Sequence, residues 1–203
     1  MPAALFEESV IDASFGAQDS LRIGLIADTH MPGTIEALWA EVHDAFAGVD
    51  CILHAGDLHT ADVIEELERL APTYVATGNG DMNVVHPRLR EVWLGEFAGH
   101  SVGMVHHFPT PARASEQKLA KRLTRHFAEQ QPQTVIYGHT HLAEVHTAGA
   151  MLYINPGSAT LPNNQSTRLG TVGVLELAPG RREVTLFQLA TGGLDAIAHA
   201  RIG

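Results

Sequence analysis

Five short apolar runs in this sequence each end in residues that can bind a metal ion. The runs are residues 21–27, 51–55, 74–77, 101–105 and 134–137. They lack polar alternation, so each is expected to be a strand buried on both faces. The residues that follow them are Asp28-Thr29-His30, Gly56-Asp57, Gly78-Asn79-Gly80-Asp81, His106-His107 and Gly138-His139-Thr140-His141. Because open α/β sheets bind ligands beyond the carboxyl ends of their strands, this pattern predicts one site built from several strand ends.

The segments between these runs predict the rest of the fold. Apolar residues at helical spacing predict helices over residues 35–47, 60–70 and 112–130. Residues 92–97 and 101–105 predict an antiparallel hairpin, and further strands are expected at 143–147, 151–154, 171–177 and 183–189. Helices alternate with strands early and strands dominate late, which favours helices covering a mixed two-sheet core. We expect residues 1–20 to be an N-terminal extension and residues 21–203 to form a single domain.

The amino-acid composition indicates where the protein is located and which partners are unfavourable. The single cysteine, Cys51, excludes an internal disulfide framework, and the acidic N-terminus does not resemble a signal peptide. No apolar run approaches the ~18 residues of a membrane span. A cytoplasmic protein with no membrane partner is therefore expected. The balance of 13 basic and 23 acidic side chains, a net charge of −10, makes a long nucleic acid an unfavourable partner.

The 13 histidines are either polar surface residues or metal ligands, and their positions decide between these roles. Residues two apart on extended backbone project to the same side, so Asp28 and His30 can bind one ion, as can His139 and His141. Each motif alone is weak, and the alternative is that these residues only cap turns. Their repeated placement after apolar strands favours metal binding.

This series of motifs resembles the calcineurin-like metallophosphoesterase superfamily. The motifs His54-Ala55-Gly56-Asp57 and Asn155-Pro156-Gly157-Ser158 are most similar to its small YfcE-type phosphodiesterase branch. The resemblance extends over residues 21–189. It implies an α/β fold with a four-layer α/β/β/α sandwich, in which two mixed β-sheets are flanked by helices.

The resemblance also implies two metal sites that share a bridging carboxylate. One ion would be held by Asp28, His30 and His141, the other by Asn79, His106 and His139, and Asp57 would bridge both. A hydroxide between two ions ~3.5–4 Å apart can attack phosphorus in line. Mixed imidazole and carboxylate donors favour manganese, iron, zinc, nickel or cobalt over magnesium and calcium, with manganese expected first.

Two departures from the family pattern bear on catalysis. Many relatives carry a histidine directly after the Asn79 position, where it is thought to assist the leaving group, and this chain has Gly80. The residue after His106 is commonly glycine, and this chain has His107. The expected catalytic residues are Asp57, Asn79 and His107, of which Asn79 and His107 would contact the substrate.

The sequence is compatible with three functions. The first is hydrolysis of a small phosphate diester, and the second is hydrolysis of a phosphomonoester such as a nucleotide or phosphoprotein. The third is a protein-interaction scaffold of the same fold, which is disfavoured because all seven ligands are retained. A homodimer is one expected assembly.

The other histidines and Asp81 are expected to have structural or surface roles. His54 is expected to be a hydrogen-bonded core residue and His59 a surface residue. Asp81 either orients a neighbouring ligand or belongs to a turn. Surface positions are expected for His43, His86, His100, His126, His146 and His199.

Overall fold

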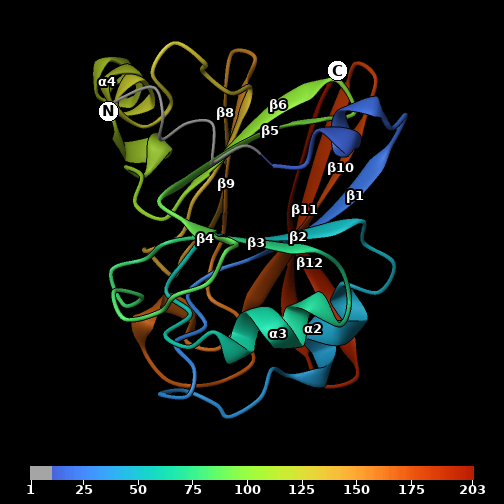
Figure 1. The fold of residues 1–203 in the computed structure, drawn as a ribbon, viewed down its shortest axis with the longest axis vertical. Coiled ribbons are helices and arrows are strands. Elements are labelled where there is room, and N and C mark those ends of the chain that lie inside the picture. Colours follow the sequence, from blue (N-terminus) through green and yellow to red (C-terminus); the bar gives the residue numbers. More distant parts are fainter. Residues whose placement is uncertain (1–10) are drawn as a thin grey trace.

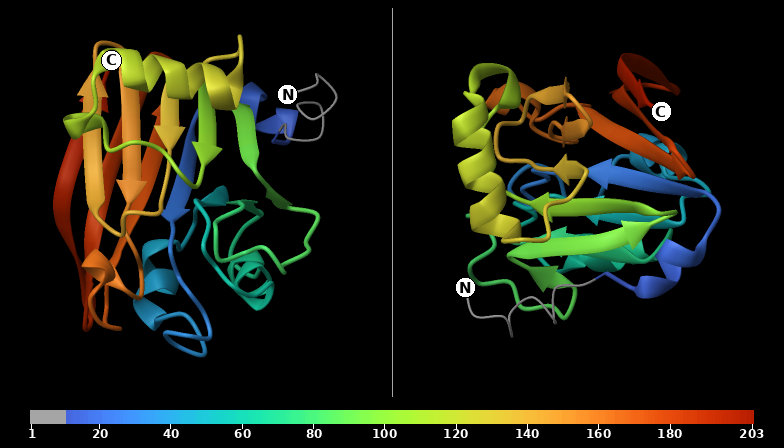
Figure 2. Two further views of the ribbon diagram at one scale, coloured as in Figure 1. Left: turned by 90° about the vertical axis from the view of Figure 1, so that its left-hand side faces the viewer. Right: turned by 90° about the horizontal axis from the view of Figure 1, so that it is seen from above.

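Two β-sheets pack face to face at the centre of the protein, and helices cover their outer faces (Figures 1 and 2). The computed structural model describes residues 11–203. The seven-stranded sheet has the order β12-β11-β10-β1-β2-β3-β4, and the five-stranded sheet has the order β5-β6-β7-β9-β8. Both sheets are mixed. In the seven-stranded sheet β1, β2 and β3 are parallel and β10 is antiparallel to β1. In the five-stranded sheet β6, β7 and β9 are parallel and β5 is antiparallel to β6. The expected α/β class with two mixed sheets is confirmed.

The strands are β1 (Leu21–Ile26), β2 (Cys51–His54), β3 (Thr73–Ala76), β4 (Leu89–Arg90), β5 (Val92–Phe97), β6 (His100–Val105), β7 (Thr134–Ile136), β8 (Ala143–Ala148), β9 (Met151–Pro156), β10 (Thr171–Ala178), β11 (Arg181–Ala190) and β12 (Gly193–Ile202). The α-helices are α2 (Ala40–Ala45), α3 (Asp62–Glu68) and α4 (Glu116–Phe127), and short 3-10 turns are η1 (Ala13–Ala17), η2 (Pro111–Arg113) and η3 (Pro162–Asn164). Among residues 11–203 there is no helix with the length and apolar character needed to cross a membrane.

Three apolar layers hold the sandwich together. The largest lies between the sheets, where Leu25 and Leu53 meet side chains such as Ile136. The second packs α2 and α3 on the seven-stranded sheet, and the third packs α4 on the five-stranded sheet (Figure 2). At Gly103 a Cβ atom would lie 2.5 Å from the Phe127 ring of α4, so glycine allows that helix to approach the sheet.

The helices are shorter than their apolar spacing predicts. The segment predicted at 35–47 is helical only over Ala40–Ala45, and the Leu38 N–H that precedes it donates to the Glu66 carboxylate (3.2 Å). The segment predicted at 112–130 starts at Glu116, where Ser115 caps the helix by accepting from the Lys118 N–H (3.3 Å).

Two segments differ from expectation. β12 was not predicted, because its ten residues form an edge strand that is mostly exposed and rich in alanine. Of the predicted extension 1–20, residues 1–10 lie outside the described part of the chain. Residues 11–20 include η1, whose buried Phe15 stacks on Phe97 at 5.5 Å, so this part contributes to the core.

Candidate metal centre

The ends of β1, β2, β3, β6 and β7 meet at one side of the sandwich and carry the predicted ligands. Two groups of donor side chains form there, and within each group the ligand atoms lie within 4.8 Å of one another. We call the group Asp28, His30 and His141 centre A, and the group Asp57, His106 and His139 centre B. All seven predicted ligands therefore lie in or beside one of two adjacent clusters.

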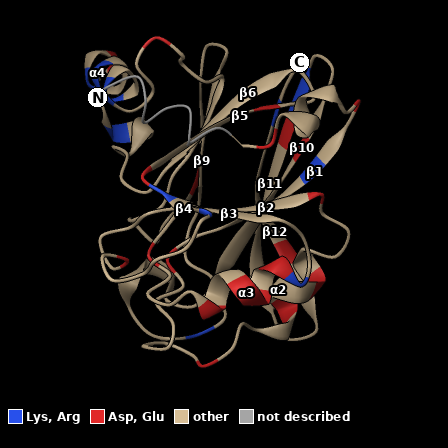
Figure 3. Ribbon diagram, in the orientation of Figure 1, with Lys and Arg blue, Asp and Glu red and all other residues tan. Residues whose placement is uncertain are grey.

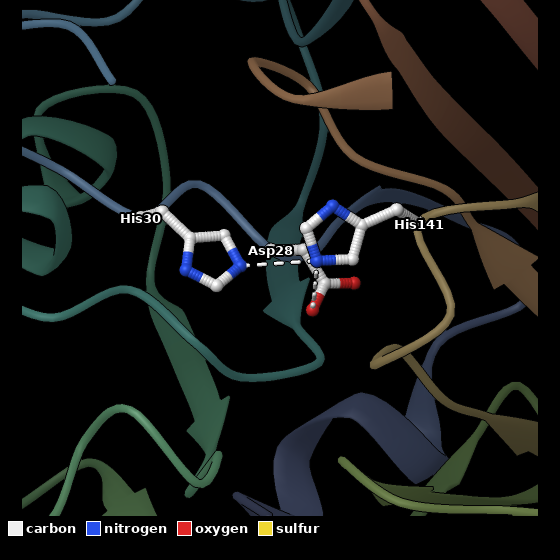
Figure 4. A group of neighbouring side chains, drawn as sticks. All are labelled: Asp28, His30 and His141. Carbon is white, nitrogen blue, oxygen red and sulfur yellow. Dashed lines mark hydrogen bonds and ion pairs between the residues drawn. The ribbon is translucent and has the colours of Figure 1, made fainter. Parts of the chain in front are cut away.

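Centre A joins Asp28 and His30, from the loop after β1, to His141, from the loop after β7 (Figure 4). The His30 and His141 Nε2 atoms are 3.1 Å apart, and His141 Nε2 lies 3.7 Å from Asp28 Oδ1. Asp28 is fully buried, and burial raises the pKa of its carboxyl well above the ordinary value. A bound cation would compensate the cost of ionising this carboxylate, so the donor set fits a transition-metal ion.

Centre B is completed by an amide. Asn79 Oδ1 lies 3.3 Å from His106 Nε2 and 3.1 Å from His139 Nδ1. His106 Nε2 in turn lies 3.4 Å from Asp57 Oδ2. These atoms converge on one point, as oxygen and imidazole ligands of one ion must.

Asp57 lies between the two centres. Its Oδ2 atom is 3.4 Å from His106 Nε2 of centre B and 3.8 Å from His30 Nε2 of centre A, while its Oδ1 accepts from the Gly80 N–H (2.7 Å). Burial opposes ionisation of Asp57. The neighbouring His106 side chain and the Gly80 N–H outweigh that opposition and hold its pKa below the ordinary value. An ionised carboxylate within reach of both donor sets is suited to bridging two ions.

Backbone carbonyls orient two of the imidazoles. His106 Nδ1 donates to Ala55 O and His141 Nδ1 donates to Leu161 O, each at 2.8 Å, so both Nε2 lone pairs face the centres. His30 differs, because its Nδ1 lies 2.8 Å from the imidazole Nε2 of His59. His59 was expected on the surface, and although exposed it contacts a candidate ligand.

His59 also fills the space beside Gly80. A Cβ atom at residue 80 would lie 2.2 Å from His59 Nε2. The imidazole that the family pattern places at residue 80 is absent, yet an imidazole from the loop after β2 lies in that space. The sequence signal for this was the pairing of Gly80 with a histidine two residues after Asp57.

The carboxylate of Asp81 organises the loop that carries Asp57. It is buried and accepts four backbone N–H groups, from Asp57, Leu58, His59 and Gly78, at 2.8–2.9 Å. The open alternative for Asp81 is thereby decided: it orients the loop of a candidate ligand.

Two residues of the Asn155-Pro156-Gly157-Ser158 turn fix the other loops. The Asn155 amide donates to Gly138 O (3.0 Å) and to Thr140 Oγ1 (2.9 Å). The Ser158 hydroxyl donates to Asp28 O (2.6 Å).

The backbone is strained where the donors are presented. Among residues 11–203, ten non-glycine residues have positive φ, and six of them lie at this site: Asp28, His30, Asp57, His59, His139 and His141. Such conformations cost about 1–3 kcal/mol each and persist only where surrounding contacts enforce them. Their concentration here indicates a site built for function.

The other histidines divide into three groups. His54 is buried as expected, with Nε2 3.2 Å from Thr29 Oγ1 and Nδ1 accepting from the Gly56 N–H (3.1 Å). His107 is exposed and stands edge-on to His139, with ring centroids 4.6 Å apart. The expected surface position is wrong for His100, which is buried and bonded to Ala178 O, and His126 lines a cavity beside centre B.

Comparisons with known proteins agree with this geometry. Residues 21–180 match the family model described as a calcineurin-like phosphoesterase superfamily domain. A probable metallophosphoesterase of Methanothermobacter thermautotrophicus is 37% identical over 144 residues, covering 70% of this chain and 79% of that protein.

Two solved structures share the fold. Vacuolar protein sorting 29 from Cryptosporidium parvum has a TM-score of 0.76 at 17% identity, covering 92% of this chain and 100% of the other. The phosphoesterase Yfce from E. coli has a TM-score of 0.60 at 19% identity, covering 90% and 100%.

Proposed function

Because the chain belongs to the calcineurin-like phosphoesterase superfamily, we propose that it is a phosphodiesterase that requires two divalent transition-metal ions. The observation that carries this proposal is the position of Asp57, whose Oδ2 lies 3.4 Å from His106 Nε2 and 3.8 Å from His30 Nε2. One carboxylate oxygen in reach of two separate donor sets supports a shared ligand and a pair of ions.

Each donor set has a defined role in the proposal. Asp28, His30 and His141 would hold one ion, Asn79, His106 and His139 the other, and Asp57 both. When bound, the ions supply positive charge for the phosphate and lower the pKa of a water molecule. The expected first metal is manganese, since the donors mix imidazole with oxygen.

The protein's own side chains would position the ester. Asn79 is exposed beside centre B and can donate its amide N–H groups to a phosphoryl oxygen while its Oδ1 faces the centre. His107, edge-on to His139, lines the same cavity as Asn79 and would contact the substrate there.

A diester is favoured over a monoester by charge. Two ions carry four positive charges, and the carboxylates of Asp28 and Asp57 compensate two of them. The cavity beside centre B adds the carboxylate of Glu91 and is lined by no Lys or Arg side chain of the described residues. A singly charged diester suits this balance better than a doubly charged monoester. The single, buried thiol of Cys51 supports a cytoplasmic location.

The second candidate function is a scaffold. It is favoured by the shared fold with vacuolar protein sorting 29, and opposed by the complete donor set. A scaffold has no need of strained loops that present seven metal donors.

Metal analysis combined with turnover tests the proposal. We expect about two manganese equivalents per chain and hydrolysis of bis(4-nitrophenyl) phosphate that stops on chelation. His146→Ala on β8, remote from both centres, is the control variant. A chain that binds one ion or none refutes the two-metal proposal. Two ions without turnover favours the scaffold, and faster hydrolysis of 4-nitrophenyl phosphate favours a monoesterase.

A further inference from the structure

A cavity of ≈ 440 Å³ opens beside centre B. Asn79, His106 and His139 form the wall that it shares with that centre, whereas no centre A residue lines it. Its volume lies within the usual range of small-molecule sites, roughly 300–1,000 Å³. A phosphate held between the two centres would therefore have room for an attached group on the centre B side.

Apolar side chains form part of the cavity wall away from the metal ligands. Val92 and Val105 of β5 and β6 are buried and line it. Met82, in the loop after β3, lines it too but is 85% exposed. A thioether that exposed has few contacts with the protein, and it packs well against aromatic rings. Met82 is therefore placed to cover an apolar ligand.

The charge in the cavity limits what can bind there. Glu91 is the one carboxylate among the lining residues outside the metal centres, and no Lys or Arg lines the cavity in the described chain. His126 of α4 is uncharged at neutral pH, because burial and then Arg122 and Arg125 on the same basic helix lower its pKa to about 4 (Figure 3). An anionic group in the cavity would meet the Glu91 carboxylate.

His126 has a further property that suits ligand binding. Its Nε2 atom is shielded from solvent and has no hydrogen-bond partner among residues 11–203. A buried polar atom without a partner is unfavourable, so native structures rarely keep one without reason. His126 also lines the cavity, so its uncharged imidazole is among the groups that a ligand there would meet.

We infer that this cavity holds the organic group of the phosphate ester, and that this group is an uncharged aromatic ring system. The inference rests on the proposed function, which places the phosphate between the two centres. It names the class of substrate: aryl or nucleoside esters of phosphate, in preference to alkyl esters or esters that carry a second anionic group.

Binding of phosphonates tests the inference without turnover, because their carbon–phosphorus bond is not hydrolysed. The probes are methylphosphonate, phenylphosphonate and 4-carboxyphenylphosphonate, titrated calorimetrically into the manganese-loaded protein. Phenylphosphonate is expected to bind about tenfold tighter than methylphosphonate, since the ring moves apolar surface out of water. 4-Carboxyphenylphosphonate is expected to bind more weakly than phenylphosphonate.

Two matched variants test whether the preference for phenylphosphonate arises in this cavity. Met82→Ala should reduce the preference for phenyl over methyl about threefold, because a ligand contact is lost. Val85→Ala, in the same loop and 92% exposed but not lining the cavity, should leave the preference unchanged. Glu91→Gln should raise the affinity for 4-carboxyphenylphosphonate selectively.

The outcomes separate the inference from the proposed function. Equal binding of phenyl- and methylphosphonate, or equal effects of Met82→Ala and Val85→Ala, overturns the inference. Turnover of bis(4-nitrophenyl) phosphate in the same preparation tests the proposed function alone. A phenyl preference in a protein without turnover rejects the phosphodiesterase while retaining the cavity as an aromatic binding site.

Discussion

A methyl group added at Gly80 should weaken metal binding at centre A and leave metal binding at centre B unchanged. The new Cβ would lie 2.2 Å from His59 Nε2 and 2.4 Å from His59 Cδ2, closer than real contacts allow. The φ angle of Gly80 is not in the left-handed region, so the backbone itself accepts alanine. The His59 ring must swing away, which removes its 2.8 Å contact with His30 Nδ1.

The size of the effect follows from what His59 does. Groups that hold a metal-binding imidazole typically contribute about 10–100-fold in affinity, or ~1.4–2.8 kcal/mol. We therefore expect Gly80→Ala and His59→Ala each to weaken the ion at centre A by about 10–100-fold. Centre B should be unaffected, because His106 is held by a backbone carbonyl.

Manganese affinity, measured by competition with a chelator, gives both binding steps. The double variant should bind no more weakly than either single variant, since both substitutions remove the same contact. Gly193→Ala is the control, because a Cβ there meets nothing within 4 Å. Wild-type affinity in Gly80→Ala, or losses that add in the double variant, would refute the role of His59.

Three further predictions concern the same site. Asp57→Asn should reduce kcat/KM by more than the ~10–100-fold expected for His54→Ala, because it weakens both ions; equal losses in folded, metal-analysed variants would contradict the bridging position. Manganese at 100 times its Kd should stabilise the fold by ~2.7 kcal/mol for each bound ion, and an unchanged thermal midpoint after chelation would show that the centres are empty in the working protein. Asp81→Asn should cost about 1–3 kcal/mol for each backbone N–H that loses its acceptor, measured by urea unfolding, with wild-type stability as the contrary result.

The buried strands and their polar ends could be predicted from the sequence, and the reason is physical. A strand covered on both faces must be apolar throughout, so β1, β2 and β7 are visible as continuous runs. The family resemblance built on the donors after these strands is confirmed by the match over residues 21–180.

Other features were not visible in the sequence. β12 lacks an apolar pattern because one edge of it pairs with β11 and most of its side chains face solvent. The contact of His59 with His30 depends on positive φ at both residues, and no local pattern reports such angles for histidine. The cavity position of His126 depends on how α4 packs over the sheet, which only the tertiary structure defines.

The strained loops raise the question of what holds them in place. Asp57 and His59 have positive φ, and the Asp81 carboxylate accepts the N–H groups of both, so one buried side chain enforces two unfavourable backbone conformations. Asp28 is enforced in the same way by Ser158, whose hydroxyl donates to its carbonyl oxygen. These restraints come from the protein and not from the ions. The donors are therefore preorganised, and binding a metal does not have to supply the energy of ordering the loops. Preorganisation of this kind favours metal binding, and the two side chains that provide it, Asp81 and Ser158, are themselves buried behind the ligands.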